Sequence, residues 1–245
     1  MGAAQGFGKR DESLLASHCD WSSVSPVPIV AVIDDDESIR KSLVRSIQAA
    51  GYKVETFASA PEFLESLVPE IASCVVSDLR MPGVNGLQLQ ELLQSKAPFL
   101  SIVFVTGYGD IIASVSAMKA GAVDFLEKPI KRNALLEAIA RAVERTSRLR
   151  NAAAEIGKLR IQYERLTPRE REVFALVSAG LLNKQVAAQL GAAEKTVKQH
   201  RGSIMRKIQA ESLADLVLMA ERLGVRPTSA NFAEAKGKLS AECGR

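Results

Sequence analysis

The sequence predicts a multidomain chain: an α/β domain built on a doubly wound parallel sheet, followed by an all-α domain. Three observations predict it. In the first half, short runs of apolar, mostly β-branched residues end at polar turns, which is typical of buried strands. Helical stretches separate these runs, as in a parallel sheet. From Leu166 onward the pattern is purely helical, and 245 residues are enough for two domains.

Four of the apolar runs end in side chains that carry a charge or a hydroxyl group. The runs are Ile29–Ile33 before Asp34-Asp35-Asp36, Cys74–Ser77 before Asp78, Ile102–Val105 before Thr106, and Asp124–Leu126 before Glu127-Lys128. The carboxyl ends of parallel strands share one edge of the sheet, and ligands bind outside that edge. We therefore expect Asp34, Asp35, Asp78, Thr106 and Lys128 to converge on one small site.

This group of side chains suits phosphoryl chemistry. Neighbouring carboxylates repel one another, and a cation that prefers hard oxygen ligands, Mg²⁺, would hold them together. A carboxylate such as that of Asp78 can attack phosphorus and form an acyl phosphate. Lys128 and the cation would neutralise charge on the transferred group, and Thr106 would donate its hydroxyl group to a phosphate oxygen.

The blocks that contain these residues resemble the receiver domain of bacterial two-component response regulators. They are Asp34-Asp35, Asp78-x-x-Met81-Pro82-Gly83, Thr106-Gly107 and Asp124-Phe125-x-x-Lys128-Pro129. All four occur in the order and spacing of the family, across about half of the chain. The resemblance implies a flavodoxin-like receiver with five βα units. It implies a regulator and not an enzyme, apart from self-phosphorylation and autodephosphorylation at Asp78.

The resemblance also implies a role for each residue at the sheet edge. Asp78 would accept the phosphoryl group from a phosphohistidine of a sensor histidine kinase. Asp34 and Asp35 would hold Mg²⁺ together with Asp78 and the backbone carbonyl of Arg80. Lys128 would pair with the phosphoryl group.

Other residues would respond to phosphorylation. Thr106 would move to bond the phosphoryl group, and Phe125 would rotate inward as Thr106 moves. Arg80 and Tyr108, each two residues beyond a residue of the site, would set the lifetime of the phosphorylated state. The peptide bond before Pro129 would be cis.

Two alternative functions can be considered for the first half. Phosphatases of the haloacid dehalogenase type also use a strand-end Asp-x-Asp with a Thr and a Lys, and Asp34-Asp35-Asp36 satisfies that pattern. Such an enzyme would not use Asp78 as nucleophile and would leave the C-terminal half without a role. A receiver that serves only for dimerisation is disfavoured by the complete set of acids. A single strand-end acid is usually a helix N-cap, and Asp36 fits that role.

Composition and charge indicate a folded protein with two unlike halves. Hydrophobic residues make up 47% of the chain and charged residues 24%. Residues 29–145 contain 12 Lys/Arg and 15 Asp/Glu, a net charge of −3, whereas residues 146–245 contain 18 and 10, a net charge of +8. An acidic half joined to a basic half indicates a signalling module tied to a nucleic-acid-binding module.

The sequence shows no sign of export or of a membrane partner. No apolar stretch approaches the length of a membrane span, and residues 1–28 lack the apolar centre of a signal peptide. The cysteines, Cys19, Cys74 and Cys243, show no metal-binding spacing and suit a reducing compartment. We expect a cytoplasmic protein.

The expected organisation has five parts: a disordered leader at residues 1–28, the receiver at 29–145, a helical linker at 146–165, a DNA-binding domain at 166–225 and a flexible tail at 226–245. The helix that begins near Arg132 is expected to continue into the linker. There, apolar residues at alternating steps of three and four form a short heptad-like stripe: Leu149, Ala152, Ile156, Leu159, Tyr163 and Leu166. The stripe either pairs two chains or packs on its own domain.

The all-α domain has the start and stop signals of four helices. The expected helices are Pro168 to Gly180, Lys184 to Leu190, Glu194 to Ile208, and Ser212 to Leu223. Thr167 is expected to cap the first helix and Asn183 the second. Gly191-Ala192-Ala193 forms the turn before the third. Two helices joined by a short turn with glycine form the helix-turn-helix pattern.

Three blocks of this domain resemble the LuxR-type helix-turn-helix. They are Leu166-Thr167-Pro168-Arg169-Glu170-x-Glu172-Val173, Gly180-x-x-Asn183-Lys184-x-Val186-Ala187-x-x-Leu190 and Lys195-Thr196-Val197-Lys198-x-His200-Arg201. The resemblance implies that the third helix enters the major groove of promoter DNA, where Lys, Arg and Gln contact phosphates and base edges. The expected contacts are Lys195, Thr196, Lys198, Gln199, His200 and Arg201, with Arg206 and Lys207 as further cations on the same helix. Ala193 stands where a capping serine is common.

A receiver followed by a LuxR-type domain is the order of the FixJ/NarL group of response regulators. The sequence therefore predicts a Mg²⁺-dependent regulator that a sensor histidine kinase phosphorylates on Asp78. Its other expected partners are promoter DNA, RNA polymerase and, on phosphorylation, a second copy of the chain. Activation by release from inhibition, in which the receiver covers Lys198 and Arg201, is an open alternative to dimerisation.

Overall fold

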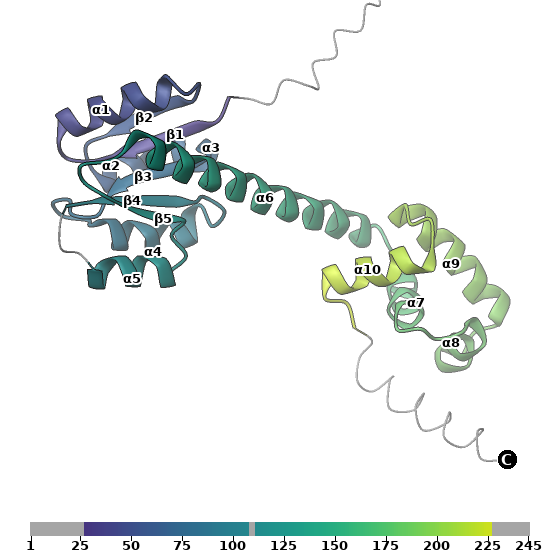
Figure 1. The fold of residues 1–245 in the computed structure, drawn as a ribbon. Helices are drawn as coiled ribbons and strands as arrows, with labels where there is room; N and C mark the ends of the chain where they lie inside the picture. The colour runs from purple at the N-terminus through teal and green to yellow at the C-terminus, as the bar shows by residue number, and fades with distance from the viewer. Residues whose placement is uncertain (1–26, 108–110, 227–245) are drawn as a thin grey trace, which may run out of the picture. The chain divides into compact units, whose positions relative to one another are not determined.

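The computed structural model describes residues 27–107 and 111–226, shown as a ribbon in Figure 1. The chain divides into two compact units, Met1–Glu144 and Arg145–Arg245. The expected leader at residues 1–28, the tail at 226–245 and Tyr108 fall wholly or almost wholly outside the described residues. Within the described part, no helix combines the length and the apolar character that crossing a bilayer requires.

The N-terminal unit contains the parallel five-stranded sheet that the sequence predicts. Its strands have the order β2-β1-β3-β4-β5, which is the flavodoxin-like order, and neighbouring strands are parallel throughout. The strands are β1 (Ile29–Ile33), β2 (Lys53–Phe57), β3 (Cys74–Asp78), β4 (Ile102–Thr106) and β5 (Asp124–Glu127). The order changes direction between β1 and β3, so a ligand site is expected at their carboxyl ends.

Helices alternate with the strands and cover both faces of the sheet. They are α1 (Glu37–Gln48), α2 (Ala60–Glu65), α3 (Val68–Ile71), α4 (Gly86–Lys96), α5 (Ile111–Lys119) and α6 (Arg132–Glu164). The segment between β2 and β3 holds two short helices instead of one. Ser66 ends α2 in extended conformation, and its hydroxyl group donates to the Phe63 carbonyl at 2.7 Å.

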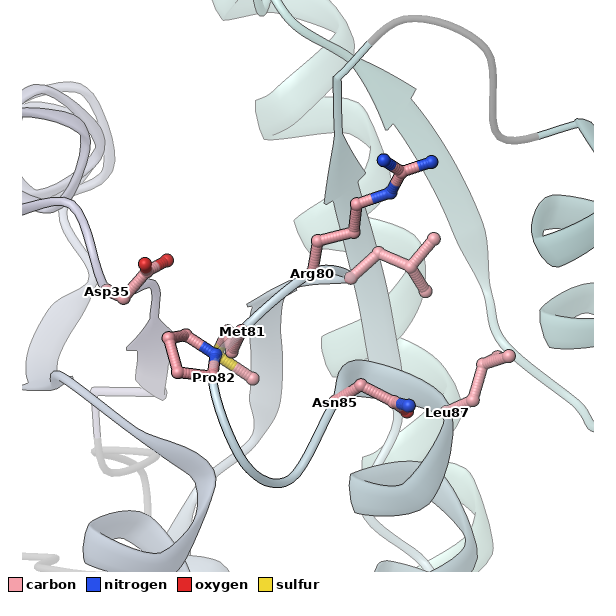
Figure 2. Close-up of a pocket in the computed structure, with 7 residues that line it drawn as sticks. Asp35, Arg80, Met81, Pro82, Asn85 and Leu87 are labelled. Carbon is pink, nitrogen blue, oxygen red and sulfur yellow. The ribbon is translucent and has the colours of Figure 1, made fainter.

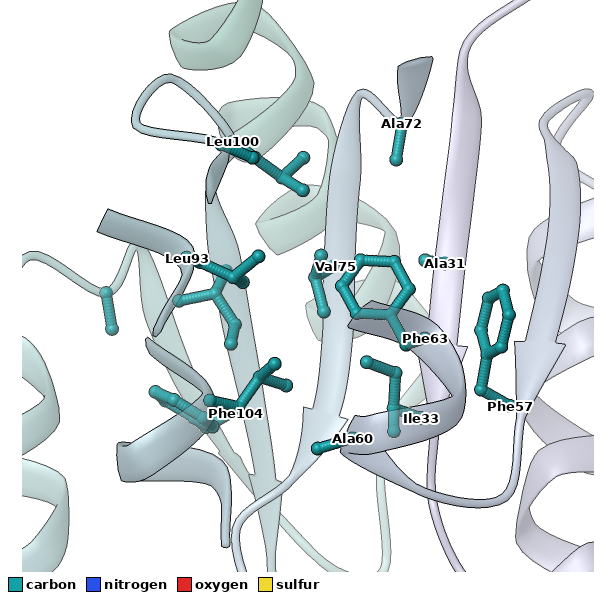
Figure 3. Close-up of a cluster of buried hydrophobic side chains, with 14 of the residues drawn as sticks. Ala31, Ile33, Phe57, Ala60, Phe63, Ala72, Val75, Leu93, Leu100 and Phe104 are labelled. Carbon is teal, nitrogen blue, oxygen red and sulfur yellow. The ribbon is translucent and has the colours of Figure 1, made fainter. Parts of the chain in front are cut away.

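The strand residues alternate between two hydrophobic clusters because successive side chains of a strand point to opposite faces. One cluster, shown in Figure 3, joins strand residues such as Ile33, Val75 and Phe104 to Phe63 of α2 and Leu93 of α4. The second cluster, on the other face, joins Val32, Val76 and Val105 to α1 and to the first part of α6. Both faces are therefore covered, which explains why the strands read as continuous apolar runs.

A close approach between α4 and β3 depends on Gly86. A Cβ atom at this position would lie 2.8 Å from the Asp78 carbonyl oxygen and 2.8 Å from the Phe104 ring. The Gly86 amide donates to the Leu79 carbonyl at 3.0 Å, which continues the contact. Only glycine lets the start of α4 lie this close to the end of β3.

The C-terminal unit is built from the end of α6 and four further helices. They are α7 (Pro168–Ser178), α8 (Asn183–Leu190), α9 (Glu194–Ile208) and α10 (Leu213–Leu223). Thr167 caps α7 as predicted, in a reciprocal capping box with Glu170. The apolar residues of these helices form one core around Phe174, Val197 and Ile204.

The predicted cap of α8 was wrong. Asn183 is the first residue of the helix, and the N-cap is Leu182. The Gln185 side chain accepts the Leu182 N–H at 2.8 Å, so the backbone donor at this end is satisfied from inside the helix. The Asn183 side chain instead accepts a hydrogen bond from Arg201 of α9, at 3.1 Å.

We expect Gly86→Ala to loosen the packing of α4 on β3, because strand and helix must separate to admit the methyl group. The cost should be roughly 1–3 kcal/mol, as for other overpacked core sites. Gly157→Ala is the matched control: it lies inside α6 with open space around its Cβ position, and there alanine should favour the helix by about 1 kcal/mol.

Hydrogen exchange measured by mass spectrometry would locate both effects. Faster exchange in β3 and α4 of the Gly86→Ala variant, with unchanged exchange in α7 to α10, is the expected pattern. Equal protection of β3 in wild type and variant would show that the close approach is not needed.

Candidate functional site

The carboxyl edge of the sheet brings together the three acids predicted from the strand ends. Asp34 and Asp35 follow β1, and Asp78 is the last residue of β3. One oxygen atom from each of the three carboxylates lies within 4.8 Å of the others. Asp34 is 1% exposed and Asp78 is 8% exposed, whereas Asp35 is exposed. The site thus has two buried carboxylates and one that reaches solvent.

Asp34 is held on both of its carboxylate oxygens. Oδ1 accepts the Asp36 N–H at 2.9 Å, and Oδ2 accepts the Lys128 ammonium group at 2.9 Å. Its backbone carbonyl accepts a hydrogen bond from the Arg40 guanidinium at 2.5 Å. Arg40 was not predicted as a site residue. Its position one turn into the following helix, where its side chain reaches back to the strand end, is the signal that could have found it.

Lys128 lies between the two buried carboxylates. Its Nζ atom is 2.9 Å from Asp34 Oδ2 and 3.3 Å from Asp78 Oδ2. Burial raises the pKa of Asp78, while Lys128 lowers it and Asp34 raises it; in sum the pKa lies above its ordinary value. Burial lowers the pKa of Lys128, but its contacts with the two carboxylates raise it more, so the lysine stays charged.

Thr106 and Phe125, the predicted switch residues, lie on the last two strands. Thr106 ends β4 and is 2% exposed, and its carbonyl accepts the Lys128 N–H at 2.8 Å. Phe125 on β5 is half-buried beside the hydrophobic cluster of Figure 3, and its ring centroid is 6.5 Å from that of Phe104. The peptide bond between Lys128 and Pro129 is cis, as predicted.

A shallow pocket opens beside the acids, between the loop after β1 and the loop after β3 (Figure 2). Asp35 lies on one side and Arg80, Met81 and Pro82 on the other, with Asn85 at the start of α4. Arg80 is exposed and lines this pocket together with Asp35. Tyr108, its predicted counterpart, lies outside the described residues.

The donor set fits a magnesium ion. Three carboxylates supply hard oxygen ligands, and ligands on opposite sides of Mg²⁺ are about 4.2 Å apart at bond lengths of about 2.1 Å. Adjacent ligands are about 3.0 Å apart at the same bond lengths, so the carboxylate oxygens, within 4.8 Å of one another, would draw closer together around the ion. The Arg80 carbonyl lies two residues beyond Asp78, on the loop that lines the pocket.

The predicted DNA contacts all lie on α9, but they differ in exposure. Lys195, Thr196, Lys198 and Gln199 are exposed, whereas His200 and Arg201 are half-buried. In the part of the chain that the structure describes, Lys195 and Lys198 form no ion pair. The Arg201 guanidinium donates to Asn183 Oδ1 at 3.1 Å, which links α9 to the first residue of α8.

Lys207, a cation expected on the polar face of α9, is engaged in an internal ion pair. Its Nζ atom lies 2.6 Å from Glu170 of α7, whose side chain is 5% exposed. Ser203 also donates to Glu170, at 2.7 Å. Burial by itself raises the pKa of Glu170. Hydrogen bonds from Lys207, Ser203 and Thr167 outweigh that effect and lower the pKa to about 2. Lys207 therefore holds α9 onto α7.

Comparisons with known proteins match the N-terminal and the C-terminal parts of the chain to two different families. Residues 30–140 match the response regulator receiver domain, and residues 164–220 match the luxR family of bacterial regulatory proteins. Nodulation protein W of Bradyrhizobium diazoefficiens is 46% identical over 221 residues, which cover 88% of this chain and 96% of the relative.

Two further relatives span both units. Transcriptional regulatory protein FixJ of Azorhizobium caulinodans is 39% identical over 201 residues, covering 81% of this chain and 94% of the relative. A low-resolution structure of response regulator StyR is 45% identical, covers 80% of this chain and 99% of its own, and superposes with a TM-score of 0.72.

We expect Glu170→Gln to destabilise the C-terminal unit by roughly 2 kcal/mol or more, because it leaves Lys207 without its charge partner. Glu172→Gln is the matched control. Glu172 is on the same helix and pairs with Arg169, but its side chain is 51% exposed, so its loss should cost less than about 0.5 kcal/mol. Thermal unfolding followed by calorimetry would compare the two variants.

The effect of Glu170 should depend on pH in a defined direction. The folded-state pKa of about 2 lies below the ordinary 4.5, so the ionised form is favoured by folding. Its contribution is complete above pH 4.5 and declines as pH falls from there toward 2. A stability gap between wild type and Glu170→Gln that widens on acidification would contradict the assignment.

Proposed function

The chain belongs to the response regulators that join a receiver domain to a LuxR-type DNA-binding domain, and on that premise we propose that phosphorylation of Asp78 controls its binding to DNA. The observation that carries the proposal is the convergence of Asp34, Asp35 and Asp78 at the switch point of the sheet, with Lys128 paired to Asp34 and Asp78. A transcription regulator needs such a site only if its DNA binding is coupled to a phosphoryl group.

In the proposed reaction, the Asp78 carboxylate attacks the phosphorus of a phosphohistidine on a sensor kinase. A P–O bond forms, the P–N bond breaks, and the histidine nitrogen keeps the electron pair. The Leu79 N–H donates to Asp78 Oδ1 at 2.8 Å, which fixes the orientation of the carboxylate. Lys128 lowers the pKa of Asp78 against the effect of burial and so favours the nucleophilic, ionised form.

Three side chains and one carbonyl would hold the metal ion: Asp34, Asp35, Asp78 and the Arg80 carbonyl. Bound there, Mg²⁺ supplies positive charge for the phosphoryl oxygens in the transition state. Lys128, whose Nζ atom lies 3.3 Å from Asp78 Oδ2, would supply the second positive charge. The buried acids Asp34 and Asp78 are already positioned by hydrogen bonds, so exposed Asp35 has the most freedom to adjust.

The phosphatase alternative is disfavoured by the position of Asp36. Its carboxylate caps α1 and accepts the Ser38 N–H at 2.7 Å and the Ile39 N–H at 3.3 Å. The third acid of the Asp-x-Asp pattern is therefore a helix cap and does not face the site. Asp78, which that class of enzyme would not use, is central to the site instead.

The switch would connect the site to a partner surface. If the Thr106 hydroxyl group were drawn to the phosphoryl group, the packing beside Phe125 would change, since the two residues lie on the neighbouring strands β4 and β5. A partner shifts a receiver from one such state to the other only if its binding free energy differs between the two states. We propose that the phosphorylated state favours a homodimer, and two linked α9 helices then bind two half-sites far more tightly than one.

The remaining parts of the proposal concern place and partners. The kinase that donates the phosphoryl group and the promoter that receives α9 meet in the cytoplasm, where RNA polymerase would also contact the complex. The receiver is proposed to cover residues 29–145, the linker 146–165 and the DNA-binding domain 166–225.

We expect Asp78→Asn to abolish labelling by acetyl phosphate, because the amide is a poor nucleophile. Asp35→Asn should retain a nucleophile but weaken Mg²⁺ binding, roughly tenfold or more, since it removes a charged ligand. Asp36→Asn is the matched control, because asparagine caps helices as well as aspartate and the side chain does not face the site. Isothermal titration with Mg²⁺ and mass-spectrometric mapping would measure the two properties.

Full labelling of the Asp78→Asn variant at the wild-type rate would sink the assignment of the acceptor. Equal losses of Mg²⁺ affinity in the Asp35→Asn and Asp36→Asn variants would sink the assignment of the metal ligands.

Arg80→Ala should shorten the lifetime of the acyl phosphate several-fold if the bulky, exposed Arg80 side chain, two residues beyond Asp78, hinders the approach of water to the phosphoryl group. Decay of the phosphorylated protein, followed after removal of acetyl phosphate, would measure the rate. A half-life equal to that of wild type would refute this role.

Lys198→Ala should weaken DNA binding and lower the slope of log affinity against log salt by about one, if Lys198 contacts a phosphate. Arg201→Ala should cost more, because it also removes the hydrogen bond to Asn183. Arg222→Ala on α10 is the control: it removes an exposed cation that pairs with Glu155. Binding isotherms at several salt concentrations would separate the cases, and equal affinities for all three variants would place DNA on another surface.

A further inference from the structure

The middle of the long helix α6 carries an apolar stripe that residues 27–107 and 111–226 leave largely exposed. Leu149 is 36% exposed and Ile156 is 44% exposed, and Ala152 is exposed between them. Leu159, one step further along the same stripe, is half-buried. The steps of three and four residues place these four side chains along one face of the helix.

Both ends of the same stripe are covered by the chain itself. Toward the N-terminus, the equivalent positions Leu135 and Ala142 are fully buried against the sheet. Toward the C-terminus, the Tyr163 ring stacks edge-on against Phe174 with centroids 5.4 Å apart, and Leu166 is buried in the core of the C-terminal unit. The sequence leaves two interpretations of the stripe open, and among the described residues packing on its own domain is established for Tyr163 and Leu166.

We propose that the stretch from Leu149 to Leu159 pairs with the same stretch of a second copy as a parallel two-stranded coiled coil. In a heptad labelled from Leu149 as position a, Ile156 is also an a position, and Ala152 and Leu159 are d positions. This inference rests on the homodimer of the proposed function and names a surface for it.

Charge complementarity selects the second copy and its direction. With the heptad above, Glu155 falls at position g and Arg160 at position e, and both are exposed. In a parallel, in-register pair, g of one helix lies beside the following e of the other, so Glu155 of each copy meets Arg160 of the other. In an antiparallel pair, e faces e and g faces g, and these two ion pairs are lost.

The contact would be weak by itself, which suits a regulated dimer. The stretch is only about three turns long, it contains alanine at one core position, and Gly157 lies within it. The Glu155 carboxylate also has an internal partner, Arg222 at 3.4 Å, but both side chains are more than half exposed, so that bond is easily exchanged. The coil would form when activated receivers hold two chains together at high effective concentration.

The opposite face of the same helix supplies a matched control. Ile161 is 56% exposed, more than Ile156, but it falls at the f position, away from the proposed seam. A general tendency of exposed apolar residues to associate would involve Ile161 as much as Ile156. Of these two residues, a coiled coil would involve only Ile156.

Disulfide trapping in the full chain tests the pairing directly. Cys19 and Cys243 are changed to serine, the buried Cys74 is kept, and either Ala152→Cys or Ile161→Cys is added. The protein is activated with beryllofluoride and Mg²⁺ and oxidised with glutathione disulfide, and sedimentation measures the dimer in parallel. We expect the Ala152→Cys variant to form a covalent dimer at least about tenfold faster than the Ile161→Cys variant, and only after activation.

Charge exchange tests the register. Glu155→Arg or Arg160→Glu should weaken the activated dimer about threefold to tenfold, because each change places like charges together twice per dimer. The double variant should regain most of the loss, which an internal role of Glu155 with Arg222 would not predict.

The outcomes separate this inference from the function on which it rests. Dimers seen by sedimentation, with equal or no trapping at the two cysteine positions, would overturn the coiled coil and leave phosphorylation-dependent dimerisation standing. A chain that stays monomeric after activation would overturn both. Dimers whose Ala152→Cys variant is trapped, but whose charge-exchanged double variant is no better than the singles, would overturn the parallel register.

Discussion

Mutual repulsion between carboxylates at one edge of the sheet is the constraint around which the N-terminal unit is organised. Asp34 and Asp78 are almost completely buried, and burial raises the pKa of Asp78. The arrangement holds because Lys128, which follows β5, contacts both acids. It holds also because a backbone N–H group donates to one oxygen of each acid. A buried charge without such partners would be costly.

The same constraint explains how the site can act as a switch. Every strand end that supplies a site residue also packs into one of the two hydrophobic clusters. A movement of one polar group therefore changes the packing of the core. Phe125 is an example: it lies on β5 beside Phe104 of β4, the same strand that ends in Thr106. The glycine at position 86 extends the coupling, since it brings α4 against the backbone of Asp78 itself.

In the C-terminal unit, a buried acid is used for stability instead of chemistry. Glu170 accepts hydrogen bonds from Thr167, Ser203 and Lys207, and its pKa falls where that of Asp78 rises. The difference is the number of donors: Glu170 is surrounded by them, whereas Asp78 faces another carboxylate. Because Glu170 takes up Lys207, the exposed cations that α9 offers to a partner are Lys195 and Lys198 near its start and Arg206 near its end.

The sequence alone determined the order of the elements, the acids at the strand ends and the three longest C-terminal helices, because these follow from local periodicity, capping residues and the shared edge of parallel strands. It could not assign Gly86 or the internal ion pair of Lys207, since both depend on contacts with residues distant in the chain. It also misplaced the cap of α8, where Asn183 is drawn away by Arg201 of the next helix. Only the tertiary structure decided which part of the α6 stripe is covered, because a periodic apolar face looks the same whether its partner is the same chain or another.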